Sequence, residues 1–281
     1  MVNSMQIVTT LAELRAARRS LAGPVGFVPT MGYLHAGHIS LARRARAECA
    51  SVVASIFVNP TQFNPNEDLA KYPRDLPRDL TQLEAAGVEL VWTPTQEDMY
   101  LPGFQTWVTV DGLTRPLEGE ARPGHFRGVT TIVAKLFNAV GPDKAYFGQK
   151  DAQQAAVIRQ MVKDLNFPVE IVVCPIVREP DGLAMSSRNV YLSAEERQAA
   201  IVLFLSLSAA KAAYDAGERQ AESLRVLVSE IVAREPLARL QYISCADYNT
   251  LEELETVKGK ALLSMAVYLG KTRLIDNFVI G

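Results

Sequence analysis

Residues 25–58 read VGFVPTMGYLHAGHISLARRARAECASVVASIFV, and this stretch gives the clearest indication of the fold. Its two ends, residues 25–30 and 51–58, are short runs rich in β-branched and apolar residues, which is typical of buried strands. Between them, residues 38–50 repeat apolar side chains at helical spacing. The stretch therefore predicts a strand–helix–strand unit.

The same alternation continues through the first two thirds of the chain. Further helices are predicted at 77–86, 129–140 and 151–165, and further strands at 88–93, 144–147 and 169–173. A short amphipathic helix is predicted within the first 20 residues. This order predicts an α/β fold with a Rossmann-like, doubly wound parallel sheet as the first domain, residues 1–176.

Two other parts of the chain break this pattern. Residues 94–127 are rich in proline and glycine, which predicts a loop insertion with one strand at 106–110; long insertions of this kind usually cover a site. After residue 175, helices are predicted at 194–216 and 220–234, and strands at 240–248, at 261–269 and from 272 onward. This order predicts a second, smaller α+β C-terminal domain, residues 177–281, with the linker near 177–182.

Composition and charge exclude several classes of protein. The chain is 48% hydrophobic, which excludes disorder as its main state, and 29 Lys and Arg against 31 Asp and Glu leave a formal net charge of -2. We therefore expect no nucleic acid partner and no membrane partner. Cys49, Cys174 and Cys245 are odd in number and widely separated, so they form neither a disulfide framework nor a CxxC metal motif. With no apolar leader in the first 20 residues, a cytoplasmic location is predicted.

Two of the three histidines, His35 and His38, lie between the first strand and the first helix of the quoted stretch. In an open α/β sheet, ligands bind at the carboxyl ends of the strands, and a helix N-terminus offers N–H groups and a positive dipole end to a phosphate. A nucleotide site is therefore one interpretation. The alternatives are two histidines that cap or pack, and a zinc pair that would need a third ligand such as His125.

The usual nucleotide-binding fingerprints are missing. The chain has no GxGxxG, and Gly270-Lys271-Thr272, which ends like a P-loop, has Met265 where the first glycine must stand. The chain is therefore not expected to be a Rossmann dehydrogenase or a P-loop kinase.

The stretch PTMGYLHAGH (29–38) resembles the HxGH signature of adenylyl-transferring enzymes with class I synthetase-like nucleotide folds, and AMSSRN (184–189) is similar to a degenerate KMSKS loop. With these go IFVNPTQF (56–63), KYPR (71–74), RPGHFRG (122–128), FGQKD (147–151) and GKTRLIDN (270–277). The whole set, in this order, resembles the pantothenate synthetase family over nearly the full chain.

The resemblance implies an ATP-dependent ligase that condenses pantoate with β-alanine through a pantoyl-adenylate intermediate and releases AMP and pyrophosphate. It also implies ATP as co-substrate, Mg²⁺ arriving with the ATP, and a homodimer. The residues alone agree, because the chain has no GxSxG and no cysteine within a motif that could serve as a nucleophile. We therefore expect the protein to act by positioning and charge stabilisation.

The resemblance also assigns residues. It implies His38 as proton donor, with His35, Lys150 and Arg188 as further catalytic groups on the phosphates. The ATP contacts that it implies are Met31, Gly32, Tyr33, Leu34, His35, Ala36, Gly37, His38, Gly148, Gln149, Lys150, Asp151, Val177, Met185, Ser186, Ser187 and Arg188. Gln62 and Gln154 are the implied pantoate positions, and Gln62 also borders the β-alanine site.

Simpler interpretations stand beside these assignments. Asp151 could be a helix cap, residues 185–188 could be a solvated turn, and either glutamine alone would be read as a surface residue. Asp79 is a possible carboxylate contact for the magnesium, but relatives often carry an acidic residue where Arg78 stands, so the protein ligand of the metal stays open. His125 and Arg127, in the predicted loop insertion, could close over the substrate.

The motifs are also compatible with two other functions. A nucleotidyltransferase could adenylate a phosphorylated acceptor, but the pair Gln62 and Gln154 and the absence of extra basic residues near 59–63 argue against such an acceptor. A nucleotide-binding module without enzymatic activity would bind ATP without producing pyrophosphate.

Overall fold

The computed structural model describes residues 5–65 and 67–281. The chain divides into two compact units, which are described separately. The first comprises the residues up to Gly148 together with Gln153–Pro175, and the second comprises Gln149–Ala152 and Ile176–Gly281.

The first unit is built on a six-stranded sheet in the order β1-β4-β3-β2-β5-β6, and all of its strand pairs are parallel. The strands are β1 (Gln6–Val8), β2 (Val25–Thr30), β3 (Ser51–Ile56), β4 (Leu90–Trp92), β5 (Lys144–Gly148) and β6 (Glu170–Cys174). The predicted strand–helix–strand unit is confirmed, because β2 and β3 are neighbours in parallel register. The short edge strand β1 was not predicted, since three residues are too few for a periodic signal.

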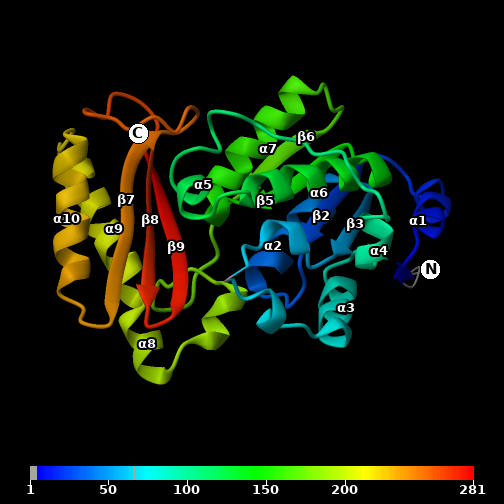
Figure 1. The fold of residues 1–281 in the computed structure, drawn as a ribbon, viewed down its shortest axis with the longest axis horizontal. Helices are drawn as coiled ribbons and strands as arrows, with labels where there is room; N and C mark the ends of the chain where they lie inside the picture. The colour runs from blue at the N-terminus through cyan, green and yellow to red at the C-terminus, as the bar shows by residue number, and fades with distance from the viewer. Residues whose placement is uncertain (1–4, 66) are drawn as a thin grey trace. The chain divides into compact units, whose positions relative to one another are not determined.

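Helices cover both faces of this sheet (Figure 1). The helices are α1 (Leu11–Arg18), α2 (Ala36–Glu48), α3 (Leu76–Ala85), α4 (Gln96–Met99), α5 (Glu118–Ala121), α6 (His125–Val140) and α7 (Ala152–Asp164). One core joins α1, α6 and α7 to the sheet, and a separate core joins α2 and α3 to it. The doubly wound architecture predicted from the sequence is therefore confirmed.

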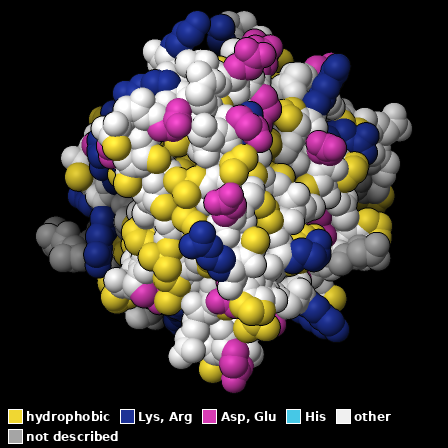
Figure 2. Space-filling view, turned by 90° about the vertical axis from the view of Figure 1, so that its left-hand side faces the viewer, with side chains coloured by type: hydrophobic (Ala, Val, Ile, Leu, Met, Phe, Trp, Pro, Cys, Tyr) yellow, Lys and Arg dark blue, Asp and Glu magenta, His cyan; other side chains and the backbone are white. Residues whose placement is uncertain are grey.

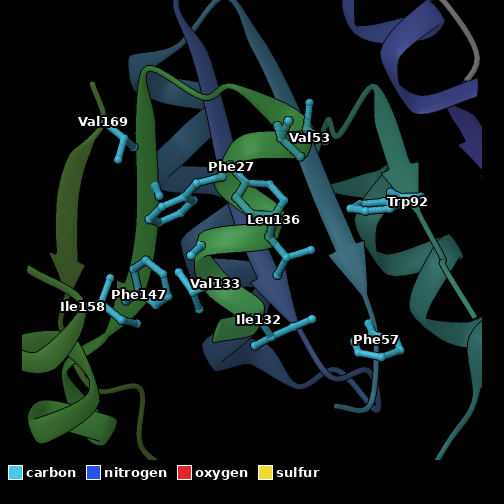
Figure 3. Close-up of a cluster of buried hydrophobic side chains, with 14 of the residues drawn as sticks. Phe27, Val53, Phe57, Trp92, Ile132, Val133, Leu136, Phe147, Ile158 and Val169 are labelled. Carbon is cyan, nitrogen blue, oxygen red and sulfur yellow. The ribbon is translucent and has the colours of Figure 1, made fainter. Parts of the chain in front are cut away.

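The two cores follow the alternation of side chains along the strands. Phe27 of β2 and Phe147 of β5 belong to the core under α6, while the adjacent Val28 and Tyr146 belong to the core under α2. Figure 3 shows the α6 side of the sheet, where Ile132, Val133 and Leu136 of α6 lie among Phe27, Val53 and Phe147. These strands are buried on both faces, which explains why the sequence shows continuous apolar runs.

The strand order reverses at β2. From β2 the sheet extends on one side through β3 and β4, and the chain then returns to add β5 on the other side. The carboxyl ends of β2 and β5 therefore flank the topological switch point, where open α/β sheets bind their ligands. The stretch that begins with Met31 leaves β2 here, and Gln149 directly follows β5.

The predicted strand at 106–110 is wrong, because no strand of the described chain includes these residues. The N–H of Val108 donates to Thr131 Oγ1 at 3.0 Å, and the Val108 carbonyl accepts from Thr130 Oγ1 at 2.6 Å. Side chains of α6 thus satisfy the backbone that a neighbouring strand would otherwise pair with.

The second unit contains an antiparallel sheet in the order β7-β8-β9, formed by Ala238–Asp247, Ala261–Leu269 and Thr272–Ile280. The helices α8 (Ala194–Ala199), α9 (Ile201–Asp215) and α10 (Ala221–Ala233) belong to the same unit. Helices α9 and α10 share an apolar core with one face of the sheet. The predicted α+β unit is confirmed, except that the helix expected at 194–216 is divided at Ala200, which ends α8 and begins α9.

Figure 2 views the side of the second unit that carries α10, where acidic and basic side chains are interspersed with apolar ones. No histidine side chain is visible on this face.

Among the described residues, no helix combines the length and the apolar character that crossing a bilayer requires.

Candidate active site

The turn between β2 and α2 has a strained backbone. Gly32 and Tyr33 have φ angles of 81° and 51°, in the left-handed region that favours glycine. A Cβ on Gly32 would lie 3.1 Å from both Asp79 Oδ2 and Ile56 Cγ2, so a larger residue would have little room. Tyr33 is not a glycine, and its conformation must be held by its surroundings.

Asp79 of α3 holds this turn. Its Oδ2 accepts a hydrogen bond from the Tyr33 N–H at 2.6 Å, and its Oδ1 accepts one from the Leu34 N–H at 2.7 Å. Burial raises the pKa of this carboxyl, which is only 1% exposed, although the hydrogen bonds from Leu34 and Tyr33 act in the opposite direction. Arg78 adds a bond from its guanidinium to the Leu34 carbonyl at 3.0 Å and lies over the Tyr33 ring.

His35 and His38 cap α2 reciprocally. His35 Nδ1 accepts from the Gly37 N–H at 3.1 Å, and His38 Nδ1 accepts from the His35 N–H at 3.3 Å. Because each Nδ1 accepts a hydrogen bond, the proton of each neutral ring is on Nε2. The two ring centroids are 4.1 Å apart. The helix begins at Ala36, two residues earlier than the apolar spacing predicts, because His35 caps it.

Gln62 lies in the 3-10 turn that follows β3, Pro60–Gln62. Its Oε1 accepts from Asn59 Nδ2 at 3.0 Å, and its Nε2 is 3.1 Å from the Met31 sulfur. With 9% exposure it is a buried residue, so the simpler interpretation of Gln62 as a surface residue is wrong. The structure therefore brings together two predicted stretches, the turn that begins with Met31 and the stretch that contains Gln62.

His125 was expected in a loop, but it is the first residue of α6 and is only 7% exposed. Its Nδ1 is 2.8 Å from the Gln62 carbonyl oxygen, and its Nε2 is 3.1 Å from Arg122 Nη1. Burial, and then the nearby Arg122 charge, lower the pKa of His125 to about 4. At neutral pH the ring is therefore uncharged, so Nδ1–H donates to Gln62 and Nε2 accepts from Arg122. Arg127, also expected in the loop, lies in the first turn of α6 with its guanidinium over the Trp107 ring.

Arg122 places a positive charge beside Gln62 that the linear sequence did not indicate. Its Nη2 lies 3.3 Å from the Gln62 carbonyl, while its Nε and Nη2 donate to the two carboxylate oxygens of Glu67 at 2.9 and 2.5 Å. The expectation that no extra basic residue lies here is therefore wrong, because the fold brings Arg122 to this place. Because the charge is held by a bidentate carboxylate, the place remains poorly suited to a phosphorylated acceptor.

Helix α6 approaches this turn backbone to backbone. A Cβ on Gly128 would lie 2.4 Å from the Thr61 carbonyl oxygen and 2.7 Å from the Gln62 nitrogen. The Gly128 carbonyl also accepts from Asn59 Nδ2 at 3.2 Å. Glycine at 128 is therefore a requirement of the space beneath Gln62.

Gly148 ends β5, and residues Gln149–Asp151 form a 3-10 turn assigned to the second unit. Lys150 Nζ lies 3.8 Å from Asp151 Oδ1. Gln154 is half-buried in the first turn of α7. Its neighbour Gln153 is buried, and its amide group donates to the Leu113 and Pro116 carbonyls, tying the loop insertion to α7.

The remaining predicted contacts lie in the second unit. Residues Arg178 and Ala184 form a bridge, and the Met185 N–H donates to the Val177 carbonyl at 3.0 Å, so Val177 and Met185 are adjacent. Ser186 caps the 3-10 helix Ser187–Tyr191 by accepting from the Arg188 N–H at 3.2 Å. The stretch 185–188 is therefore a defined cap and helix start.

The described residues contain no group of three or more His, Cys, Asp or Glu side chains that could hold a metal ion. Both Asp79 oxygens already accept backbone hydrogen bonds.

The family model described as pantoate–β-alanine ligase matches residues 6–279. The chain belongs to the pantoate–β-alanine ligase family. It is therefore an enzyme, a ligase that forms pantothenate.

Individual relatives agree with this membership. The pantothenate synthetase of Roseiflexus sp. (strain RS-1) is 62% identical over 98% of this chain and 99% of its own length. A crystal structure of the pantothenate synthetase of Thermus thermophilus is 49% identical, with a TM-score of 0.94 over 98% of this chain and 99% of that one. The ligase from Francisella tularensis, 36% identical with a TM-score of 0.81 over 98% of both chains, was crystallised with β-γ ATP and β-alanine.

Several residues beside the predicted contacts were missed as individual residues. Asn59, Arg122 and Gln153 lie within or beside quoted motifs, but their spacing carried no sign of what each one contacts. Asn59 shows the difficulty, because its single side chain contacts Gln62, Gly128, Thr61 and the Tyr100 hydroxyl. Only the fold brings those partners together.

Proposed function

We propose that this ligase activates pantoate by adenylation. A pantoate carboxylate oxygen attacks the α-phosphorus of ATP, and the bond to the β,γ-pyrophosphate breaks. The amine of β-alanine then attacks the acyl carbon of pantoyl adenylate, AMP leaves with the bonding electron pair, and the amine loses a proton. The complex of the Francisella tularensis relative with β-γ ATP and β-alanine supports ATP and β-alanine as ligands.

The observation that carries this proposal is the pair of histidines at the switch point. Their Nδ1 atoms are used in capping α2, so each ring presents an Nε2–H donor at the N-terminus of that helix. Negative charge that develops on phosphate oxygens is stabilised by donors that are already oriented. We assign His38 as proton donor and His35 as its companion on the phosphates.

The other proposed ATP contacts follow from the strand ends and from the second unit. They are the backbone and side chains of Met31, Gly32, Tyr33, Leu34, Ala36 and Gly37, then Gly148, Gln149, Lys150 and Asp151, and then Val177, Met185, Ser186, Ser187 and Arg188. Lys150 and Arg188 supply positive charge to the phosphates. The Val177 backbone contacts the adenine.

We propose Gln62 and Gln154 as the residues that bind pantoate, with Gln62 also bordering β-alanine. A neutral carboxamide holds hydroxyls and a carboxylate by hydrogen bonds without forming a salt bridge. A carboxylate held in this way stays more nucleophilic than one paired with an arginine. The anchoring of Gln62 by Asn59 and by His125 supports a fixed position for this group.

Magnesium enters this reaction as part of the substrate MgATP, bound to phosphate and water oxygens. The described side chains do not form a dedicated cage for it, and Asp79 is engaged with the backbone of the turn. We therefore propose that Asp79 holds the turn of Tyr33 and Leu34, and we derive no catalytic step through the metal.

Isotope transfer tests the adenylation. Pantoate labelled with ¹⁸O in its carboxylate is incubated with MgATP and β-alanine, and the nucleotide and phosphate products are analysed by mass spectrometry. The proposal expects AMP with one ¹⁸O in its phosphate and unlabelled pyrophosphate. ADP with labelled inorganic phosphate would instead establish an acyl-phosphate route and overturn it.

Three further features belong to the proposal. We propose domains at 1–176 and 177–281, supported by the separate apolar cores of the two units.

We propose a homodimer, supported by the exposed Leu101 and Trp107 at the ends of a loop segment that has no strand partner in the described chain. Light scattering of the purified protein measures the oligomeric state. We propose a cytoplasmic location, supported by three buried free thiols that suit a reducing compartment.

A further inference from the structure

Strand β9 carries two adjacent polar residues that the proposed reaction does not use. Asp276 and Asn277 lie within β9 and are 1% and 3% exposed. They end the GKTRLIDN stretch, for which the resemblance gave no role to any single residue. Buried polar groups of this kind are costly unless each finds hydrogen-bond partners, so their partners indicate what the strand holds.

Asn277 holds the turn that contains Lys150. Its Nδ2 donates to the carbonyl oxygens of Gln149 and Lys150 at 3.0 and 2.9 Å. Its Oδ1 accepts from the side-chain Nε2 of Gln149 at 3.0 Å. One carboxamide therefore makes three hydrogen bonds to two consecutive residues that follow β5.

These contacts require an amide at position 277. Carbonyl oxygens only accept hydrogen bonds, so the group that faces Gln149 O and Lys150 O must be the NH₂ group. An aspartate has nearly the same shape but no donor, and it would direct a negative charge at two carbonyl oxygens.

The side chain of Gln149 is held at both ends. Its Nε2 is used by Asn277, and its Oε1 accepts from the Tyr248 hydroxyl at 3.3 Å. Strand β9 and the residue that follows β7 thus fix the residue immediately before Lys150.

Asp276 holds a different stretch on the opposite face of β9. Leu274, Phe278 and Ile280 share the apolar core of α9 and α10, and alternation places Asp276 on that same face. Its two oxygens pair with Arg178 Nη1 and Nη2 at 2.6 and 2.9 Å, and the guanidinium lies over the rings of Phe204 and Phe278. Arg178 is the residue after Val177 and bridges to Ala184.

We propose that Asn277 is a positioning residue for Lys150. We also propose that β9 fixes the positions of the turn 149–151 and the stretch 177–188 relative to each other within the second unit. The inference rests on the proposed role of Lys150 at the phosphates. A lysine side chain is long and flexible, so only the placement of its backbone can be fixed in advance. A misplacement of about 1 Å costs on the order of 100-fold in rate, so the hydrogen bonds by which Asn277 holds the Lys150 backbone should affect the rate strongly.

The test compares Asn277→Asp and Lys150→Ala, singly and together, in steady-state assays of pyrophosphate release. Asn277→Asp is expected to lower kcat on the order of 10- to 100-fold, with a smaller change in KM for ATP, because the lost contact matters most in the transition state. In the Lys150→Ala background the same change is expected to cause no further loss, since its effect passes through Lys150.

Ser264→Ala is the matched control. Ser264 of β8 lies directly opposite Asn277 in register, is buried, and its hydroxyl makes no hydrogen bond to the described residues. This variant changes the same part of the sheet and removes no hydrogen bond to the turn, so it should keep the kcat of the wild type.

The outcomes separate the inference from the proposed function. If Lys150→Ala keeps full kcat, the assignment of Lys150 fails and the inference fails with it. If Lys150→Ala loses kcat but Asn277→Asp does not, or if the two losses multiply, only the inference is overturned. Should Asn277→Asp not fold, Tyr248→Phe decides: a loss of kcat that disappears in the Lys150→Ala background supports the anchor, and an unchanged kcat overturns it.

Discussion

The two units hold their proposed ATP contacts with different chemical groups. In the first unit, the carboxylate of Asp79 accepts the N–H groups of Tyr33 and Leu34. In the second unit, the amide of Asn277 donates to the carbonyl oxygens of Gln149 and Lys150. Both anchors are buried, and each binds two consecutive backbone groups that the local turn exposes.

The backbone groups that each turn exposes determine which side chain can hold it. The left-handed turn after β2 presents N–H groups, which need an acceptor, whereas the turn after β5 presents carbonyls, which need a donor. Asp and Asn have nearly the same shape, yet neither could replace the other, because a buried mismatch leaves the backbone groups unsatisfied. Turnover should be more sensitive still to the loss of His38, the proposed proton donor.

The largest effect is expected for His38→Ala. Loss of the proposed proton donor should lower pyrophosphate release by a factor of about 10² to 10⁴, while thermal unfolding shows a folded protein. The control is Ser40→Ala, which removes a hydrogen bond to the Gly37 carbonyl in the same helical turn and leaves both imidazoles. Near-normal turnover in His38→Ala would remove the proton donor from the mechanism.

The first anchor is tested by Asp79→Asn. An amide directs an N–H group at one of the two backbone donors, so the turn should shift; we expect kcat to fall on the order of 10- to 100-fold and stability to fall by about 1–3 kcal/mol. Asp75→Asn is the matched control on the same helix, since Asp75 is the N-cap and asparagine caps equally well. Kinetics and urea unfolding measure both effects; an Asp79→Asn enzyme equal to the control would show that the Asp79 carboxylate is not needed to hold the turn.

A smaller effect is expected for Arg188→Ala. Removing one of several positive charges on the phosphates should raise KM for ATP about tenfold, with less change in kcat. Lys211→Ala removes the same charge from the exposed surface of α9 and should leave KM unchanged. Initial rates over a range of ATP concentrations decide this, and equal KM values in the two variants would remove Arg188 from the proposed ATP contacts.

The smallest effect on turnover, but a distinct effect of pH, is expected for His125→Gln. The folded pKa of about 4 lies below the ordinary value of 6.5, so between these values the unfolded chain binds a proton that the folded chain excludes. Stability should therefore fall as pH falls from 6.5 towards 4, by about 3 kcal/mol in total.

The glutamine variant should lack this part of the acid destabilisation, because its amide can still donate to the Gln62 carbonyl without titrating. Urea unfolding of both proteins at pH 7 and pH 4.5 measures the difference. Parallel pH dependence in the two proteins would show that His125 is not held neutral.

Most of the fold could be predicted from the sequence because its signals are local. Buried parallel strands read as continuous apolar runs, and the stretch 25–58 contains a complete unit with both strands and its helix. The strand predicted at 106–110 failed because Thr130 and Thr131 side chains, remote in sequence, satisfy that backbone.

The candidate site divides in the same way. The histidines at 35 and 38 could be found from their place between a strand and a helix. The partners of Asp79, His125 and Asn277 could not, since each contacts backbone atoms far away in the chain, and no periodicity records a contact to a backbone atom.

The lack of room for a Cβ on Gly128 beside the Thr61 carbonyl limits how this enzyme can vary. No residue is smaller than glycine, so every substitution there adds bulk and pushes α6 away from Gln62. Every mutation at position 128 is therefore expected to weaken the packing of α6 against this turn. An engineer who wants room for a larger acid should leave position 128 alone and start from Met31, whose flexible thioether already lies against the Gln62 amide.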